Sequence, residues 1–180
     1  MAVQLLTPRL RLRRWRPADG PDLAAIFAKP EVWRYPLGRG LTAMETSAFL
    51  RRRLEEQRSA PWRLWAAELR DPLRLVGYVG LAEPTFLPEI LPAVEIGWRL
   101  DPLWWGRGLA TEAARAALDH AFGAPGLDEV VSIYQPENEA SGRVMQRLGM
   151  RVERDTRHPV LGVALRVCRL ARRDWELARP

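Results

Sequence analysis

The fold is decided by the stretch WWGRGLATEA at residues 104–113. Three small residues, Gly106, Gly108 and Ala110, lie where a loop runs into a helix expected over residues 107–122. Small side chains let a ligand approach the backbone, and the first N–H groups of a helix have no partner within it. With the helix dipole, these donors suit a phosphate or pyrophosphate. The alternative is a tight turn whose glycines only allow the helix to pack on a sheet, and the local pattern leaves both open.

Three extended segments precede this loop. The runs at residues 62–69 and 75–82 are separated by RDP at residues 70–72. Because Asp-Pro is a turn former, we expect a hairpin. A further strand is expected over residues 93–100, directly before the loop.

The N-terminal part predicts one strand and two helices. Residues 7–13 alternate polar and apolar side chains, which indicates a strand with one buried face. Asp19 is expected to cap a short helix. Thr42 and Glu45 have capping-box spacing at the start of a second helix. Residues 30–40, between the two helices, are predicted to form a loop.

A strand, a helix and two more strands are predicted after the glycine-containing loop and its helix. The strand is expected over residues 129–134, and Asn138 is expected to cap a helix that ends near Gly149. Strands over residues 151–157 and 160–172 complete the order. The whole order predicts an α/β (α+β) fold, a mixed sheet of seven strands flanked by about four helices.

Composition favours a single soluble domain spanning residues 1–180, because 47% of the residues are hydrophobic and 28% are charged. No apolar run approaches the ~20 residues that a membrane span needs. The first residues lack the basic patch and the apolar stretch of a secretion signal. We therefore expect a cytoplasmic protein with no membrane partner.

The net charge of +6 comes almost entirely from arginine, since Lys29 is the only lysine. The arginines either form a solvated, ion-paired surface or attract an anionic partner, such as a nucleic acid or a phosphorylated ligand. They are spread along the whole chain instead of being clustered with aromatic residues. We therefore expect no direct nucleic-acid partner.

The sequence offers no metal site. Cys168 is the only cysteine, which excludes an internal disulfide and a thiolate-rich site. Its strand-like surroundings favour a buried, inert thiol. His120, late on a helix, and His158, near a turn, are interpreted as structural or surface residues. We expect no bound metal.

Five segments together resemble the GNAT acetyltransferase superfamily. EIGWRLDP at residues 95–102 and WGRGLATEA at residues 105–113 are similar to its central motif. NEAS at residues 138–141 and QRLGM at residues 146–150 match the second signature of the RimJ/RimL-like branch, named for enzymes that acetylate the N-termini of ribosomal proteins. TPRLRLR at residues 7–13 is similar to its first strand. The resemblance spans residues 7–176 and implies a GNAT-like, mostly antiparallel sheet.

The resemblance implies acetyl-coenzyme A (acetyl-CoA) as the cosubstrate, with its pyrophosphate on the backbone amides of residues 106–111. The superfamily pattern for this site is Gln/Arg-x-x-Gly-x-Gly/Ala, which Gly108 and Ala110 match. Trp105 stands at the Gln/Arg position, as is common in the branch, and leaves a side-chain contact there open. Arg107 either adds charge toward the phosphates or faces solvent.

The same resemblance implies that the pantetheine arm pairs with the main chain of residues 98–100. The helix start at Asn138 would contact the arm from its other side. Asn138 also caps a helix well without a ligand, and both roles can coexist. The residues implied in cosubstrate binding are Trp98, Arg99, Leu100, Trp105, Gly106, Arg107, Gly108, Leu109, Ala110, Thr111, Asn138 and Ser141.

Three side chains are candidates for proton transfer when an amine attacks the thioester directly in a ternary complex. Glu95 is the first candidate base, acting through water, because its apolar neighbours in sequence favour a raised pKa. The alternative is a structural carboxylate paired with an arginine. Ser141 matches the position of the proton donor in the branch, or it satisfies the first turn of its helix. Tyr134 is either the alternative donor or a core tyrosine.

The acceptor is expected to be an amine of either a peptide N-terminus or a small molecule. The resemblance implies that the loop around Trp33 and Tyr35 and the turn around His158 border the acceptor cleft, and Glu95, Trp62 and Trp65 are further candidates for its lining. A homodimer stays open. Two other functions compete with the enzyme: a non-catalytic coenzyme A sensor on the same fold, and an arginine-rich nucleic-acid-binding module.

Overall fold

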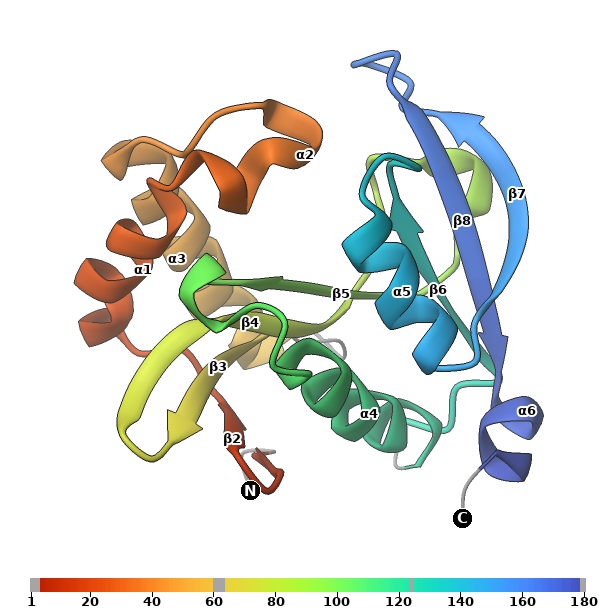
Figure 1. Cartoon of the computed structure of the whole chain (residues 1–180), viewed down its shortest axis with the longest axis horizontal. Helices are drawn as coiled ribbons and strands as arrows, with labels where there is room; N and C mark the ends of the chain where they lie inside the picture. The colour runs from red at the N-terminus through yellow and green to blue at the C-terminus, as the bar shows by residue number, and fades with distance from the viewer. Residues whose placement is uncertain (1–3, 60–63, 124, 179–180) are drawn as a thin grey trace.

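One sheet organises the chain, of which the computed structural model describes residues 4–59, 64–123 and 125–178. Eight strands in these ranges form the order β1-β2-β3-β4-β5-β6-β8-β7 (Figure 1). Only β5 and β6 are parallel neighbours; all other pairs are antiparallel. The strands are β1 Leu5–Leu6, β2 Leu10–Arg13, β3 Leu64–Arg70, β4 Leu73–Ala82, β5 Glu95–Leu100, β6 Glu129–Tyr134, β7 Arg151–Arg157 and β8 Ala164–Ala171. The predicted mixed, mostly antiparallel α/β class is confirmed.

The sheet has one strand more than the seven predicted, because residues 7–9 form a turn and Leu5–Leu6, before the strand expected over residues 7–13, pair with β2. The Thr7 N–H donates to the Leu10 carbonyl (2.9 Å), and the Thr7 hydroxyl accepts the Leu10 N–H (2.9 Å). This turn folds β1 back onto β2, with Leu5 opposite Leu12.

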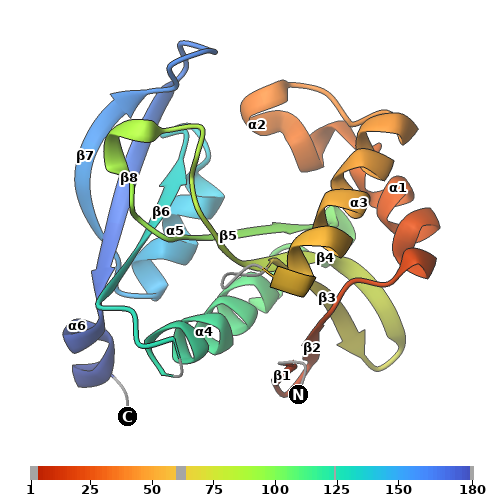
Figure 2. The ribbon, with the colours of Figure 1, turned by 180° about the vertical axis from the view of Figure 1, so that it is seen from behind.

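Six α-helices flank the sheet in the described ranges. They are α1 Gly20–Phe27, α2 Arg34–Leu37, α3 Ala43–Ser59, α4 Leu109–Phe122, α5 Glu139–Arg147 and α6 Arg172–Leu177. Helices α4 and α5 lie on one face of the sheet (Figure 1), and α1 and α3 cover the opposite face (Figure 2). The four predicted helices correspond to α1, α3, α4 and α5.

The two helices beyond the predicted four are short. Helix α2 lies inside residues 30–40, where Pro30 and Pro36 favour the predicted loop. Helix α6 follows β8 without a linker, so the strand predicted over residues 160–172 covers a turn, β8 and the start of α6. One turn of helix has too few apolar positions for a periodic pattern.

Two predicted caps are confirmed. Glu45 accepts the Thr42 N–H (2.8 Å), and the Thr42 hydroxyl accepts the Glu45 N–H (3.2 Å), which is a capping box. Asn138 accepts the Ser141 N–H through its side-chain oxygen (3.3 Å). Both caps are local, so their spacing in sequence is enough to predict them.

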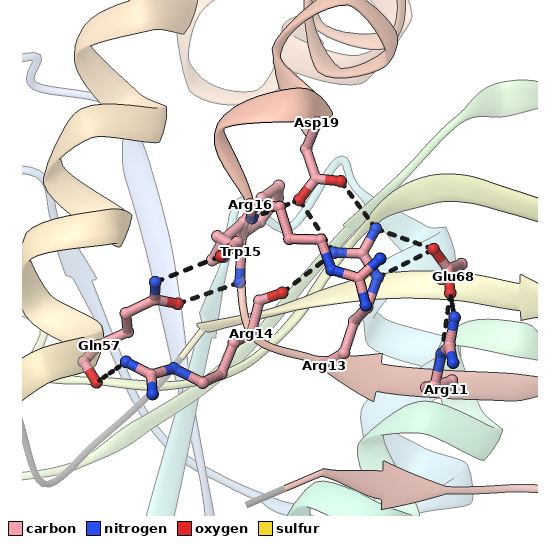
Figure 3. Close-up of polar contacts among 8 residues, drawn as sticks. All are labelled: Arg11, Arg13, Arg14, Trp15, Arg16, Asp19, Gln57 and Glu68. Carbon is pink, nitrogen blue, oxygen red and sulfur yellow. Dashed lines mark hydrogen bonds and ion pairs between the residues drawn. The ribbon is translucent and has the colours of Figure 1, made fainter. Parts of the chain in front are cut away.

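The cap predicted for Asp19 is wrong, because its carboxylate belongs to a buried ion-pair network (Figure 3). It accepts the Arg16 N–H (2.8 Å) and two hydrogen bonds from the Arg13 guanidinium (2.7 and 2.9 Å), and α1 has no side-chain cap. Arg13 also pairs with Glu68 on β3 (2.8 Å), and Glu68 pairs with Arg11. Part of the arginine content is therefore structural.

The core between the sheet and α4 contains Trp65, which was predicted to border the acceptor cleft. Helix α4 contributes four alanines with no exposed surface, so it lies close to the sheet. Trp65 is 1% exposed and packs edge-on against His120 of α4, with ring centroids 5.4 Å apart. The prediction that Trp65 borders the acceptor cleft is therefore wrong. Trp62 lies outside the described residues.

Candidate active site

A gap between β5 and β6 is the central feature of the site. The two strands share one register pair, Glu95 with Val131. Beside it, the Val131 N–H donates to the Val94 carbonyl (2.9 Å), and the Ser132 hydroxyl donates to the Ile96 carbonyl (2.8 Å). Beyond these contacts β5 continues with β4, whereas β6 turns away with β8 and β7 (Figure 1). The sheet is therefore open along the second half of β5.

Trp98 presents its main chain to this gap. The Ile96 carbonyl accepts from β6, and the Leu100 carbonyl accepts the Trp105 indole N–H (2.7 Å), so both point away from β4. Main-chain groups of alternate residues in a strand point the same way, so those of Trp98 do so too, while those of Arg99 face β4. No described residue of β6 pairs with Trp98. Of the predicted strand residues, Trp98 alone offers a free main-chain donor and acceptor to a ligand.

The glycine loop after β5 leaves helix donors without partners. Gly106 and Gly108 have φ of 73° and 77°, in the left-handed region that favours glycine. Gly108 is the N-cap of α4 and supplies no side-chain cap, and the first helical bond runs from the Glu112 N–H to the Gly108 carbonyl (3.0 Å). Within the described ranges, the N–H groups of residues 109–111 have no acceptor. These unpaired donors are the feature on which the predicted anion site depends.

Arg9 reaches this loop from the other end of the chain, and the sequence patterns do not reveal it. Its Nε donates to the Glu112 carboxylate (2.7 Å), and its Nη1 donates to the Arg107 carbonyl (2.8 Å). Its Nη2 lies 3.6 Å from the position that a Cβ on Gly108 would occupy. Arg9 therefore supports the loop and places a cation beside its helix N-terminus.

The charge of Glu112 is balanced within the same contact. Burial alone would raise the pKa of this carboxyl, but hydrogen bonds from Thr7 (2.6 Å) and from the N–H and side chain of Arg9 lower it below its ordinary value. The carboxylate is thus ionised in the first turn of α4, and Arg9 offsets its repulsion of a bound anion. Arg107, by contrast, has its guanidinium over the Trp104 ring, 4.7 Å from the centroid.

Glu95 lies at the base of the gap. Burial raises the pKa of its carboxyl to about 7, although the Ile133 N–H and the charge of Arg99 both favour the ionised form. The carboxyl therefore changes charge near neutral pH. Arg99 hydrogen-bonds the Val32 and Tyr35 carbonyls and makes no ion pair with Glu95, so the alternative of a structural ion pair is not favoured.

Two hydroxyl groups lie near the start of α5, and they differ in their partners. Within the described part of the chain, no hydrogen bond uses the Ser141 hydroxyl. The Tyr134 hydroxyl lies near the Arg166 guanidinium and helps to raise the pKa of that group. Its ring packs against the helix, because a Cβ on Gly142 would lie 3.1 Å from a ring carbon. Ser141 is therefore the freer proton donor of the two.

An open cleft of about 570 Å³ lies beyond the C-terminal end of β6. Its walls come from α2, the segment after β6, and the ends of β7 and β8, and they include Tyr35 and Gln135. The Tyr35 hydroxyl donates to the Glu137 carbonyl (3.1 Å), which joins α2 to the segment before α5. Trp33 does not line the cleft: it packs edge-on against Phe27, with ring centroids 5.1 Å apart.

Arg99 fixes the position of this wall. Its guanidinium lies 3.8 Å from the centroid of the Trp33 ring, and it donates to the carbonyls of Val32 and Tyr35. The side chain therefore ties the α2 segment to β5. Of the residues around His158, Arg157 and Gly162 border the cleft, while the His158 ring stacks on Phe86.

Similarity to known proteins identifies the family. Residues 9–151 match the family model of the acetyltransferase (GNAT) domain. The chain belongs to the GNAT acetyltransferase family. This acetyltransferase is 29% identical over 156 residues to YoaA, an uncharacterized N-acetyltransferase of Bacillus subtilis (strain 168), and the match covers 83% of each chain.

Solved structures share the fold of this GNAT acetyltransferase. An acetyltransferase from Agrobacterium tumefaciens str. C58 is 27% identical, with a TM-score of 0.78 and coverage of 94% of this chain and 95% of that chain. The ribosomal-protein-S5-alanine acetyltransferase from Vibrio fischeri is 18% identical, with a TM-score of 0.76 and coverage of 99% and 100%. The second likeness, at 18% identity, shows a shared fold.

The described residues fit acetyl-CoA, the acetyl donor that GNAT acetyltransferases use. The unpaired N–H groups of residues 109–111 suit a diphosphate, and the free main chain of Trp98 suits the amides of a pantetheine arm. Burial raises the pKa of the Cys168 thiol, which favours the inert interpretation. In the described ranges, no three His, Cys, Asp or Glu side chains are grouped to hold a metal ion, and no helix has the length and apolarity to cross a bilayer.

Proposed function

We propose that this GNAT acetyltransferase transfers an acetyl group from acetyl-CoA directly to a primary amine in a ternary complex. The observation that carries the proposal is the gap between β5 and β6, with a carboxyl group of raised pKa at its base. The glycine loop follows β5, and Gln135 of the cleft follows β6, so both sites border the gap. Holding both reactants there removes several kcal/mol of the entropic barrier, at most about 11 kcal/mol.

The cosubstrate is held by main-chain groups and one added cation. The N–H groups of residues 109–111 would bind the diphosphate, as the helix dipole favours. The free Nη2 of Arg9, beside Gly108, would add positive charge there. The N–H and carbonyl of Trp98 would pair with the pantetheine arm and direct the acetyl group toward Glu95.

Glu95 and Ser141 are the proposed proton-transfer groups. With a pKa of about 7, the Glu95 carboxyl is about half ionised at neutral pH, so it can accept the amine proton through a water molecule. The Ser141 hydroxyl, which has no partner among the described residues, would donate a proton to the departing thiolate and recover it from solvent. Tyr134 is the second candidate, because its hydroxyl lies near the Arg166 guanidinium.

A thiol-release assay tests the function. The amines are N-terminal peptides, polyamines, aminoglycosides and amino acids, and acetyl-CoA binding is measured separately by calorimetry. We expect Glu95→Gln to lower kcat by about 10²-fold or more while acetyl-CoA affinity is retained. Ser141→Ala compared with Tyr134→Phe assigns the proton donor, because only the true donor lowers kcat strongly.

Two outcomes would contradict the proposal. Binding of acetyl-CoA without thiol release from any amine would favour the coenzyme A sensor. Full activity of Glu95→Gln would remove the carboxyl group from the mechanism. A protein that binds neither acetyl-CoA nor coenzyme A would contradict the proposed cosubstrate site altogether.

A further inference from the structure

Two arginines without an ion-pair partner among the described residues line the acceptor cleft. Arg34 on α2 and Arg157 at the end of β7 both line it, and both are exposed. Arg34 has its guanidinium over the Tyr35 ring, 5.6 Å from the centroid, and Arg157 donates to the Gly162 carbonyl (2.9 Å). No described carboxylate pairs with either guanidinium. Two cations that make no such ion pair thus face the same open volume, whose walls also include Glu137.

Three other arginines of the same hairpin are paired with carboxylates. Arg166 on β8 makes two hydrogen bonds to the Asp155 carboxylate (2.6 and 2.9 Å). Arg154 on β7 and Arg169 on β8 both contact the Glu153 carboxylate, at 2.6 and 2.5 Å. Arg157 lies two residues beyond Asp155 on the same strand, and within the described ranges its guanidinium donates only to the Gly162 carbonyl. Carboxylates therefore neutralise three arginines of this hairpin, whereas Arg157, which lines the cleft, makes no ion pair with a described residue.

One acidic residue lines the cleft, and a second lies at the base of the gap. Glu137 is a wall residue of the cleft, and Glu95 pairs with Val131 at the base of the gap, where the Ile133 N–H favours its ionised carboxyl. The arginines come from the outer walls, α2 and the β7–β8 hairpin. An acceptor with its amine near Glu95 would therefore extend its other end toward the two guanidinium groups.

We propose that Arg34 and Arg157 select amine acceptors that carry a carboxylate near the amine, such as acidic amino acids or peptides with an acidic N-terminal segment. This inference rests on the proposed function and narrows its acceptor. Arginine binds carboxylates through paired, charge-assisted hydrogen bonds, and the free N–H groups of both side chains are available for this. Polycationic amines meet two guanidinium groups and one carboxylate in the cleft walls, so the net positive charge disfavours them.

Matched acceptors test the proposal by thiol release at low salt. Three tripeptides begin with serine and continue with two aspartates, two asparagines or two lysines; free aspartate and spermidine complete the set. We expect kcat/KM for the acidic tripeptide or for aspartate to exceed that for the asparagine and lysine tripeptides by at least about tenfold. The preference should weaken at high salt, because both arginines are exposed and are screened by ions. A higher kcat/KM for the acidic tripeptide than for free aspartate identifies a peptide as the acceptor, and the reverse identifies a free amino acid.

Variants tie the preference to the two side chains. Arg34→Gln and Arg157→Gln should each lower the acidic-to-neutral ratio of kcat/KM by about tenfold, which is about 1.4 kcal/mol, without changing KM for acetyl-CoA. Arg74→Gln removes an equally exposed arginine near the β3–β4 turn, far from the β7–β8 turn in both views, and should keep the ratio (Figures 1 and 2).

Two results would overturn this inference alone. One is equal or better use of the lysine tripeptide or spermidine, and the other is an acidic preference that survives in the double variant of Arg34 and Arg157. Absence of acetyl transfer to every acceptor, with acetyl-CoA still bound, would overturn the proposed function as well.

Discussion

The raised pKa of Glu95 predicts how the stability of the protein depends on pH. The rise from 4.5 to about 7 corresponds to about 3 kcal/mol, at about 1.4 kcal/mol for each tenfold change in the ionisation constant. Between pH 4.5 and 7 the unfolded chain ionises this carboxyl and the folded chain resists ionisation. This group therefore lowers the free energy of unfolding as pH rises through that window, and its effect is constant above about pH 8.

Glu95→Gln isolates this contribution because glutamine does not ionise. Relative to the natural protein, the variant should gain about 3 kcal/mol of stability between pH 4.5 and pH 8. Carboxyls of lowered pKa, such as Glu68 and Glu153, change stability in the opposite direction, but they are present in both proteins and cancel in the difference. Urea unfolding of both proteins at four pH values gives the difference directly. If the difference in the free energy of unfolding between the two proteins stays constant from pH 4.5 to 8, the pKa of Glu95 is not raised by burial.

Three further predictions concern the cosubstrate loop and α5. Gly108→Glu should abolish the rise in Tm that acetyl-CoA causes, because it places a carboxylate at the diphosphate site; Gly108→Ala shares the φ of 77° and controls for backbone strain. Arg9→Gln should raise KM for acetyl-CoA about tenfold with little change in kcat. An unchanged KM would show that Arg9 does not contribute to acetyl-CoA binding. Gly142→Val should lower the free energy of unfolding, measured in urea, by about 1–3 kcal/mol, because its Cβ would press on Tyr134. The double variant with Tyr134→Ala should recover part of this loss. An unchanged free energy of unfolding in the single variant would contradict the contact.

Predictions from the sequence are confirmed for features that depend only on residues a few positions apart, such as helix caps. The capping box at Thr42 and Glu45 and the cap at Asn138 need only a spacing of three residues. Gly149 ends α5 with φ of 80°, as its position after the helix predicts. The order of strands and longer helices follows from patterns of the same kind.

Contacts between distant segments could not be predicted in this way. Asp19 has the residue type and position of a cap, but Arg13 binds it because β2 ends beside the turn that precedes α1. The sequence does not tell which face of its strand Trp65 lies on. That face is set by packing against α4, where the Trp65 ring contacts His120. Arg9 and Glu112 are 103 residues apart, so no spacing rule joins them.

The open edge at Trp98 has a consequence for the protein inside a cell. If the pantetheine arm occupies that edge, it acts as an additional strand that joins the two halves of the sheet. The arm is the same before and after acetyl transfer, so coenzyme A and acetyl-CoA would stabilise the fold to a similar degree. Resistance of this protein to unfolding should then follow the total coenzyme A concentration and respond little to the acetylated fraction.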